Sequence, residues 1–253
     1  MELATVVVLC AAFLAIAALY SSVGHAGASG YLATMALLGV APEQMKPTAL
    51  LLNIVVATLG VWRFVRAGLF SWRLFWPFGL ATVPMAFLGG RLAVSPALYK
   101  PLLGLVLLAA AARLLLVKGE QEIEQPRPPR VPLSLAVGGA IGLLSGITGT
   151  GGGIFLSPLA LLRRWARIRE ISALSSVYIL VTSIAGLLGH RVHSETLPRE
   201  LPWFAAAVLV GGLLGSSLGV RRLDPLRLRQ ALGAVLVIAG GKLLIEGAVA
   251  LAG

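Results

Sequence analysis

The chain has 253 residues, of which 58% are hydrophobic and only 12% are charged. Because about a quarter of the residues in a soluble domain are charged, this composition predicts a polytopic membrane protein. The formal net charge of +11 does not indicate a nucleic-acid partner, because the basic residues cluster in short stretches between apolar segments. Cys10 is the only cysteine, so a disulfide within the chain is excluded.

Ten apolar segments follow one another along the chain. They cover residues 3–23, 31–41, 48–62, 74–92, 101–117, 133–147, 153–162, 171–189, 201–220 and 228–250. A membrane-spanning helix needs about 20 residues, so the second and the seventh segments are too short to cross alone. No positive charge precedes the first segment and no cleavage site follows it, which favours a retained helix over a signal peptide. The expected fold class is an all-α polytopic membrane protein.

A glycine cluster precedes each of the two short segments. The sequence "GHAGASG" covers residues 24–30, and "GITGTGGG" covers residues 146–153. Each cluster is expected to break a helix inside the membrane and to begin a half-helix, whose free N–H groups and partial positive charge suit a small anion. Close helix packing is the alternative, because small residues also serve that purpose in membranes. The repetition before two short segments favours a substrate site.

The two halves of the chain resemble each other. Gly24, Gly27 and Gly30 recur 122 residues later as Gly146, Gly149 and Gly152, and "TAL" recurs as "SAL" after about the same interval. The stretch between the halves is rich in proline and charge and is interpreted as a linker. We therefore expect three parts, which are an N-terminal repeat at 1–117, a cytoplasmic linker at 118–132 and a C-terminal repeat at 133–253.

The loop charges predict that the two repeats have opposite topology. Loop 42–47 carries one Lys, whereas its partner 163–170 carries four Arg; loop 63–73 carries three Arg and no acid, whereas 191–200 carries two Arg and two Glu. By the positive-inside rule, equivalent loops then lie on opposite sides of the membrane, as in an inverted repeat. Both chain ends are expected outside. The third pair of loops, 93–100 outside and 221–229 inside, follows the same rule.

The candidate substrate site combines the two breaks with polar residues on the helices that follow them. Hydroxyl and amide groups can donate to an oxyanion without the cost of a buried charge, and Asn53 is the strongest of these candidates. His25 has three open roles, which are contact with the anion, proton transfer, and a bond to a carbonyl freed by the break. The candidates are Gly24, His25, Gly27, Ala28, Ser29, Gly30, Asn53, Thr148, Gly149, Thr150, Gly151, Gly152, Gly153, Ser175 and Ser176.

Other kinds of site are not indicated. No carboxylate lies in the middle of an apolar segment, which disfavours a cation pump. No group of residues has metal-ligand spacing or pairs a nucleophile with a base, so neither a metal, a cofactor nor an enzyme activity is expected. "GITGTGGG" lacks the Gly-Lys-Ser/Thr ending of a phosphate-binding loop. Arg113 and Lys242 occupy equivalent places near helix ends, where we expect their side chains to reach the lipid headgroups. Glu246 lies four residues after Lys242, so an ion pair between these two is the alternative.

The two glycine breaks, the central loop and the "TAL…N" and "SALSS" helices resemble the TauE/SafE sulfite exporter family of bacterial transporters. The resemblance implies a multi-pass permease of the inner (cell) membrane for a small sulfur-containing anion such as sulfite, sulfoacetate or another organosulfonate. It also implies that both glycine motifs line the pathway. We expect secondary transport by alternating access. A passive anion channel on the same scaffold, another small anion as substrate, and a homo-oligomer stay open; nucleic acid is not an expected partner.

Overall fold

The computed structural model describes residues 1–22, 24–116, 123, 125–190, 197–218 and 225–252. Within these residues the secondary structure is entirely helical, which confirms the predicted all-α class. The linker 118–132 and the loops 191–200 and 221–229 lie partly outside the described residues. The helices are α1 (Leu3–Ser21), α2 (Ala28–Leu37), α3 (Pro42–Arg66), α4 (Trp72–Arg91), α5 (Pro96–Leu116), α6 (Val131–Thr148), α7 (Gly153–Leu162), α8 (Ile168–Gly189), α9 (Leu201–Leu218) and α10 (Pro225–Ala252).

Helices α2 and α7 are the two half-length helices that the sequence predicts. Each has 10 residues, which corresponds to a rise of about 15 Å, or about half of the hydrocarbon core of a bilayer. Helix α7 has the predicted bounds, whereas α2 begins at Ala28, three residues before the predicted segment. The N-caps are Gly27 and Gly152, both in the left-handed region that favours glycine.

Six helices of the described chain are long and apolar enough to cross a membrane, and these are α1, α3, α5, α6, α8 and α10. The sequence predicts α4 and α9 as further spans, but neither meets this criterion. The apolar part of α9, Leu201–Ser216, is too short. Helix α4 carries two tryptophans, two prolines and three glycines, which lower its hydropathy. The six apolar helices make the protein a multi-pass membrane protein.

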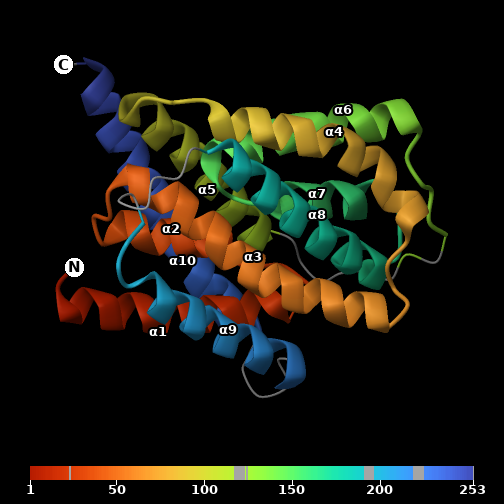
Figure 1. Ribbon diagram of the computed structural model, residues 1–253, viewed down its shortest axis with the longest axis horizontal. Helices are drawn as coiled ribbons and strands as arrows, with labels where there is room; N and C mark the ends of the chain where they lie inside the picture. The colour runs from red at the N-terminus through yellow and green to blue at the C-terminus, as the bar shows by residue number, and fades with distance from the viewer. Residues whose placement is uncertain (23, 117–122, 124, 191–196, 219–224, 253) are drawn as a thin grey trace.

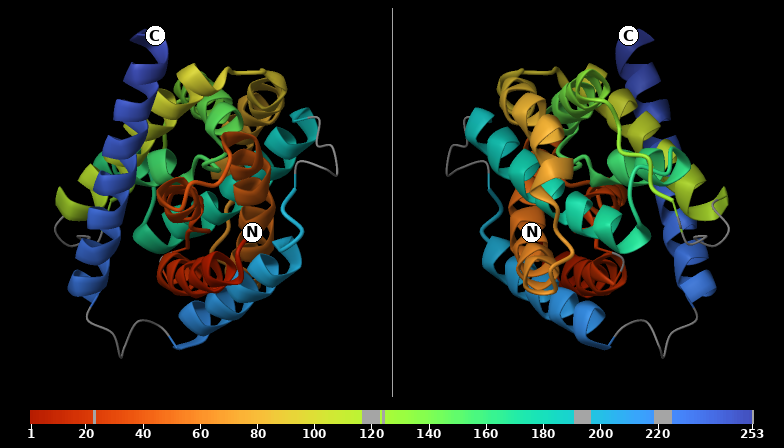
Figure 2. Two further views of the ribbon diagram at one scale, coloured as in Figure 1. Left: turned by 90° about the vertical axis from the view of Figure 1, so that its left-hand side faces the viewer. Right: turned by 90° about the vertical axis from the view of Figure 1, so that its right-hand side faces the viewer.

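The helices pack in pairs around the two short ones. Most of the long helices run roughly along the longest axis of the molecule, and α5 and α10 lie obliquely to them (Figure 1). The most extensive contacts join α4 with α6, α5 with α10, and α1 with α9. Viewed along the long axis, these pairs lie at the periphery and α2 and α7 lie inside (Figure 2). The two breaks are therefore enclosed by helices of both halves.

Glycine allows the closest of these helix pairs to form. A Cβ atom at Gly146 of α6 would overlap the carbonyl oxygen of Ala86 in α4, and one at Gly215 of α9 would overlap that of Ala18 in α1. Such backbone contacts are the usual means by which small residues join membrane helices. The packing alternative is therefore correct for Gly146, although that residue belongs to the second glycine cluster.

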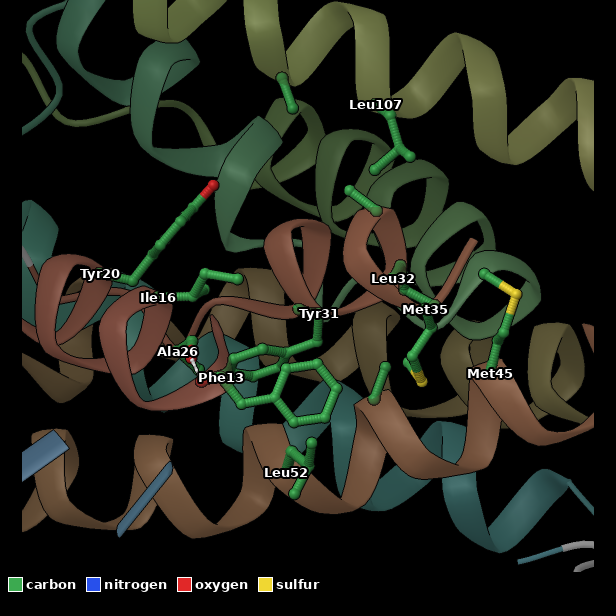
Figure 3. Close-up of a cluster of buried hydrophobic side chains, with 14 of the residues drawn as sticks. Phe13, Ile16, Tyr20, Ala26, Tyr31, Leu32, Met35, Met45, Leu52 and Leu107 are labelled. Carbon is green, nitrogen blue, oxygen red and sulfur yellow. Dashed lines mark hydrogen bonds between the residues drawn. The ribbon is translucent and has the colours of Figure 1, made fainter. Parts of the chain in front are cut away.

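An aromatic core holds the first break in place (Figure 3). The ring of Phe13 on α1 contacts those of Tyr31 on α2 and Phe204 on α9, with centroid distances of 5.1 and 5.2 Å. The hydroxyl of Tyr31 donates to the carbonyl oxygen of Ala26 at 2.6 Å. A carbonyl that the break frees from helical bonding is thus satisfied inside the protein, as membrane burial requires.

A second apolar cluster packs around α4, α7 and α8. It includes Phe78, Trp165 and Tyr178, all nearly inaccessible to solvent. Ile123 of the linker is only 7% exposed and belongs to the same cluster. This residue therefore anchors the connection between the halves against the C-terminal half and α4.

Candidate functional site

The first break lies between α1 and α2 and is held by the other half of the chain. Gly24 and Gly27 have φ angles of +80° and +104°, which side chains other than glycine rarely adopt. The backbone N–H of His25 donates to the carbonyl oxygen of Tyr20 at 2.9 Å. The hydroxyl of Ser176 on α8 donates to the carbonyl oxygen of Gly24 at 2.9 Å.

His25 is the centre of a buried polar cluster. Its side chain is among the buried polar groups, with 7% exposure, and its Nε2 lies 2.8 Å from Oγ of Ser157 on α7. Oγ of Ser157 lies in turn 2.6 Å from Oγ of Ser175 on α8. A Cβ atom at Gly153 would lie 3.7 Å from Cδ2 of His25. The first break of one half thus meets the N-terminal part of the short helix of the other half.

Arg113 of α5 brings a positive charge to this cluster. Its Nη1 lies 3.3 Å from Nε2 of His25. A guanidinium only donates hydrogen bonds, so the imidazole can take part in this contact only as an acceptor through Nε2. We call His25, Ser157, Ser175 and Arg113 the His25 cluster.

Arg113 and Lys242, which we expect to reach toward the headgroups, both have polar partners within the protein. Arg113 turns toward His25. Lys242 donates to the carbonyl oxygens of Ala36 and Leu37 at 2.8 and 3.2 Å, at the C-terminal end of α2. The carbonyl groups at the C-terminal end of a helix carry a partial negative charge, which stabilises a lysine beside them.

The second break lies between α6 and α7 and faces α3 and α8. Gly149, Gly151 and Gly152 have φ angles of +82°, +76° and +74°. The hydroxyl of Thr182 donates to the carbonyl oxygen of Gly151 at 2.7 Å. A Cβ atom at Gly151 would overlap Nδ2 of Asn53, so glycine is required there for both conformation and space.

Asn53 is fully buried and has spare hydrogen-bonding capacity. Its Nδ2 lies 3.4 Å from Oγ of Ser183, and its Oδ1 has no partner among the described residues. With the amide rotated by 180°, the hydroxyl of Ser183 can donate to Oδ1, which leaves the NH₂ group to donate elsewhere. In this orientation the amide of Asn53 has N–H donors available beside Gly151.

Other predicted residues lie near the breaks but outside the His25 cluster. Ala28, Ser29 and Gly30 form the first turn of α2. The hydroxyl of Ser29 is bonded to that of Tyr20 at 2.8 Å. Gly30 has an ordinary helical backbone and packs on Ile16, so it serves helix packing.

Thr148 and Thr150 bond to each other instead of to His25. Their hydroxyl oxygens lie 3.0 Å apart at the second break. The hydroxyl of Tyr99 on α5 donates to the carbonyl oxygen of Thr148 at 3.1 Å. Both hydroxyls therefore lie at the second break and outside the His25 cluster.

Sequence reasoning missed two members of the His25 cluster. Ser157 lies 132 residues from His25 along the chain, and Arg113 lies 88 residues away. The available signal was the basic residue at equivalent places in both halves, which is unusual at the end of an apolar segment. Ser157 carried no such signal, because a serine in an apolar half-helix commonly bonds to its own helix, as Ser157 also does to Gly153 at 3.0 Å.

Two pockets open at different parts of the molecule. A pocket of about 280 Å³ reaches the first break, and Gly24, His25, Arg63 and Ser176 are among its lining residues. A pocket of about 590 Å³ lies beside Lys46 and ends near the second break; its lining includes Arg91, Tyr99, Ile147 and His190. The two pockets have no lining residue in common.

The comparisons with known proteins agree with this architecture. The family model described as sulfite exporter TauE/SafE matches residues 8–243. A probable membrane transporter protein of Sinorhizobium fredii is 42% identical over 92% of this chain and 96% of its own length. A probable membrane transporter protein of Methanocaldococcus jannaschii is 24% identical over 76% of each chain. No solved structure matches the chain. With its family match across nearly the whole length and its six apolar helices, the chain belongs to the TauE/SafE family of membrane transporters.

Proposed function

We propose that this transporter moves a small sulfur-containing anion, such as sulfite, sulfoacetate or another organosulfonate, by alternating access. The observation that carries the proposal is the His25 cluster, in which the first break, the short helix α7 and α8 meet. The family's description as sulfite exporters points to the same class of substrate.

The cluster has the chemistry of an oxyanion site. Ser157 and Ser175 carry hydroxyl groups that can rotate from each other and from His25 to donate to an anion, and Arg113 supplies a positive charge within hydrogen-bonding distance of the imidazole. The N-terminus of α7 lies next to His25 and adds N–H groups and the positive end of a helix dipole. A sulfite or sulfonate group has three oxygen acceptors, so it can bond to several of these donors at once.

We infer that the two halves, residues 1–117 and 133–253, form an inverted repeat. Helices α4 and α6 pack together just as α9 and α1 do, and α5 packs on α10. If α1–α5 correspond in order to α6–α10, the pair α4–α6 corresponds to the pair α9–α1, and the pair α5–α10 corresponds to itself. A two-fold axis between the halves relates the pairs in this way. Such a relation supports a substrate site between the two broken helices.

Contacts between loops support the proposed sidedness. The N-terminal amine lies 3.0 Å from Oε1 of Glu200, and Nζ of Lys100 lies 2.8 Å from Oε2 of Glu246. Both ion pairs join segments that the loop charges place outside. Arg73, Glu170 and residues of the linker together line a pocket of about 680 Å³, and the loop charges place all of these segments inside.

The two separate pockets favour a carrier over a channel. The described residues give one pocket that reaches His25 and another that ends near Tyr99 and the second break, with no shared lining. A channel needs a continuous path, whereas a carrier exposes its site to one side at a time. The structure is therefore consistent with a state in which the His25 cluster is accessible through the smaller pocket.

Transport by reconstituted protein tests the proposal. Proteoliposomes preloaded with unlabelled sulfite or sulfoacetate should accumulate external ³⁵S-labelled substrate by counterflow, with saturable initial rates. Ser175→Ala should reduce the rate, whereas Thr58→Ala should not, because the Thr58 hydroxyl is exposed and donates to the carbonyl of Ile54 in its own helix. Non-saturable flux without counterflow would indicate a channel. No flux of any oxyanion across a panel of sulfur, phosphorus and carbon anions would contradict the proposal.

A further inference from the structure

The pocket beside Lys46 contains a buried positive charge, and no ion pair with an acidic group of the described residues balances it. Lys46 is only 6% exposed. Its Nζ donates to the carbonyl oxygens of Gly90 and Gly89 at 3.0 and 3.4 Å, and no carboxylate of a described residue lies within ion-pair distance. An ammonium has three N–H donors, so one donor and the full charge remain for a ligand.

Lys242 is compared with Lys46 because its side chain also lies at the C-terminal end of a helix. It also donates to two carbonyl oxygens at the end of a helix, those of Ala36 and Leu37. Its Nζ, however, lies 3.8 Å from Oε1 of Glu246, which compensates its charge. Capping of α4 therefore explains the hydrogen bonds of Lys46 but not its lack of an acidic partner, because a buried charge without compensation is costly.

The other ionisable side chains of the pocket are mostly basic. Arg91 follows Gly90 on α4, and His190 follows the end of α8. Glu43 is the one acidic residue in the lining, and it is exposed at the start of α3. The pocket has a volume of about 590 Å³, which lies within the range of roughly 300–1,000 Å³ that is usual for small-molecule sites.

We propose that this pocket is a second binding site for a small oxyanion, bound by Lys46 together with Arg91 and His190, which also line the pocket. The inference rests on the proposed function, because it places the second site on the transport pathway. The pocket borders Ile147 and Tyr99 at the second break, whereas the His25 cluster lies at the first. The anion therefore binds here when it enters or leaves on the side where loops 42–47 and 93–100 lie.

His190 provides a direct probe of this site. Its burial, and then the charge of Lys46, lower the pKa of its imidazole, while a hydrogen bond to Gly90 opposes the shift. The groups around it are Lys46 from α3, Arg91 and the Gly90 carbonyl from α4, and Glu43 at the rim. A bound anion adds negative charge beside the ring, so it raises the pKa of His190.

The experiment is NMR spectroscopy of the full-length protein, labelled with isotopes at histidine and held in detergent. It follows the imidazole resonances. The probes are sulfite and methanesulfonate, with chloride as a comparison. We expect a saturable shift of the His190 resonance in the wild type. The same shift is expected in Ser157→Ala, in which the His25 cluster is altered.

Matched lysine variants separate anion binding from capping. Lys46→Gln keeps donors for the two carbonyls but removes the charge. We expect it to raise the anion concentration at the midpoint of the His190 shift at least about tenfold. Lys242→Gln makes the same change at the other capped helix end and is expected to leave the midpoint unchanged. Lys46→Arg restores the charge and is expected to recover binding at least in part.

The outcomes distinguish this site from the proposed function. A His190 resonance that does not respond to sulfite or methanesulfonate, or that responds equally in Lys46→Gln, overturns the second site even if the protein transports anions. A saturable response that Lys46→Gln abolishes supports the site even if reconstituted protein shows no flux, in which case the transport proposal fails instead.

Discussion

Replacement of Ser157 by alanine is the sharpest test of the His25 cluster, because one hydroxyl connects its parts. Oγ of Ser157 lies 2.8 Å from Nε2 of His25 and 2.6 Å from Oγ of Ser175, and the residue is only 1% exposed. Removal of this group takes the printed partner from the buried hydroxyl of Ser175 and one of two close polar neighbours from Nε2 of His25. An unsatisfied buried group costs about 1–3 kcal/mol, so we expect a moderate loss of thermal stability in detergent.

The same substitution has a larger and more specific effect on the substrate. A hydrogen bond to a charged group contributes about 1.5–3 kcal/mol, so loss of this donor should raise KM for the anion roughly 10- to 150-fold. The assay is the initial rate of labelled sulfite or sulfoacetate uptake by proteoliposomes over a range of concentrations. Thr58→Ala serves as the control for loss of a hydroxyl. An unchanged KM in folded Ser157→Ala protein would refute the assignment of the site.

Four further substitutions test the helix packing, a buried hydroxyl and the ionisation of His190 by thermal melts. Gly90→Ala should lower the melting temperature strongly, because its Cβ would overlap the carbonyl oxygen of Gly186. Gly241→Ala meets no atom within 4 Å and should stabilise α10 by about 0.5–1 kcal/mol. Equal melting temperatures of the two variants would contradict the packing. Ser145→Ala should be neutral or slightly stabilising in a thermal melt, because its buried hydroxyl has no partner among the described residues, and a clear loss would show that it has one. The pKa of His190 is lowered in the folded protein, so the unfolded chain binds the proton more readily. The stability of the protein therefore falls as the pH drops below about 6.5. Melts of His190→Gln should lack this part of the pH dependence.

The helices could be predicted from hydrophobicity, but some of their starting points could not. Helix α7 has the predicted bounds, because glycine and a polar turn mark its two ends. Helix α3 begins at Pro42, six residues before the predicted segment, because its first turns carry Glu43 and Lys46 and so are not apolar. Pro42 at the first helical position was the better signal, since its fixed φ suits a helix start.

The glycine clusters illustrate where sequence reasoning stops. Spacing could show that Gly24 and Gly146 occupy equivalent places, but not that one has a left-handed backbone and the other packs against a carbonyl. The two roles place the same demand on the sequence, because each requires the absence of a Cβ atom. Valine at Gly27 or Gly151 would therefore disturb folding first and would not test substrate binding by itself.

Long-range polar contacts were the part that the sequence could not provide. His25 and Ser175 were predicted from residue type, and Asn53 from its burial in an apolar segment. Arg113 was assigned to the headgroups, because an arginine near a helix end usually reaches them. Its contact with His25 depends on the packing of α5 beside the first break, which local patterns do not encode.

The most direct test of the central claim is to locate a bound anion in crystals soaked with selenite, a heavier analogue of sulfite with a strong anomalous signal. The account predicts an anomalous peak within hydrogen-bonding distance of Ser157 and Ser175 and beside His25. This peak should disappear in crystals of Ser157→Ala while a peak beside Lys46 persists. Selenite bound only at the surface, or peaks at both places that the substitution leaves unchanged, would contradict the assignment of the His25 cluster as the substrate site.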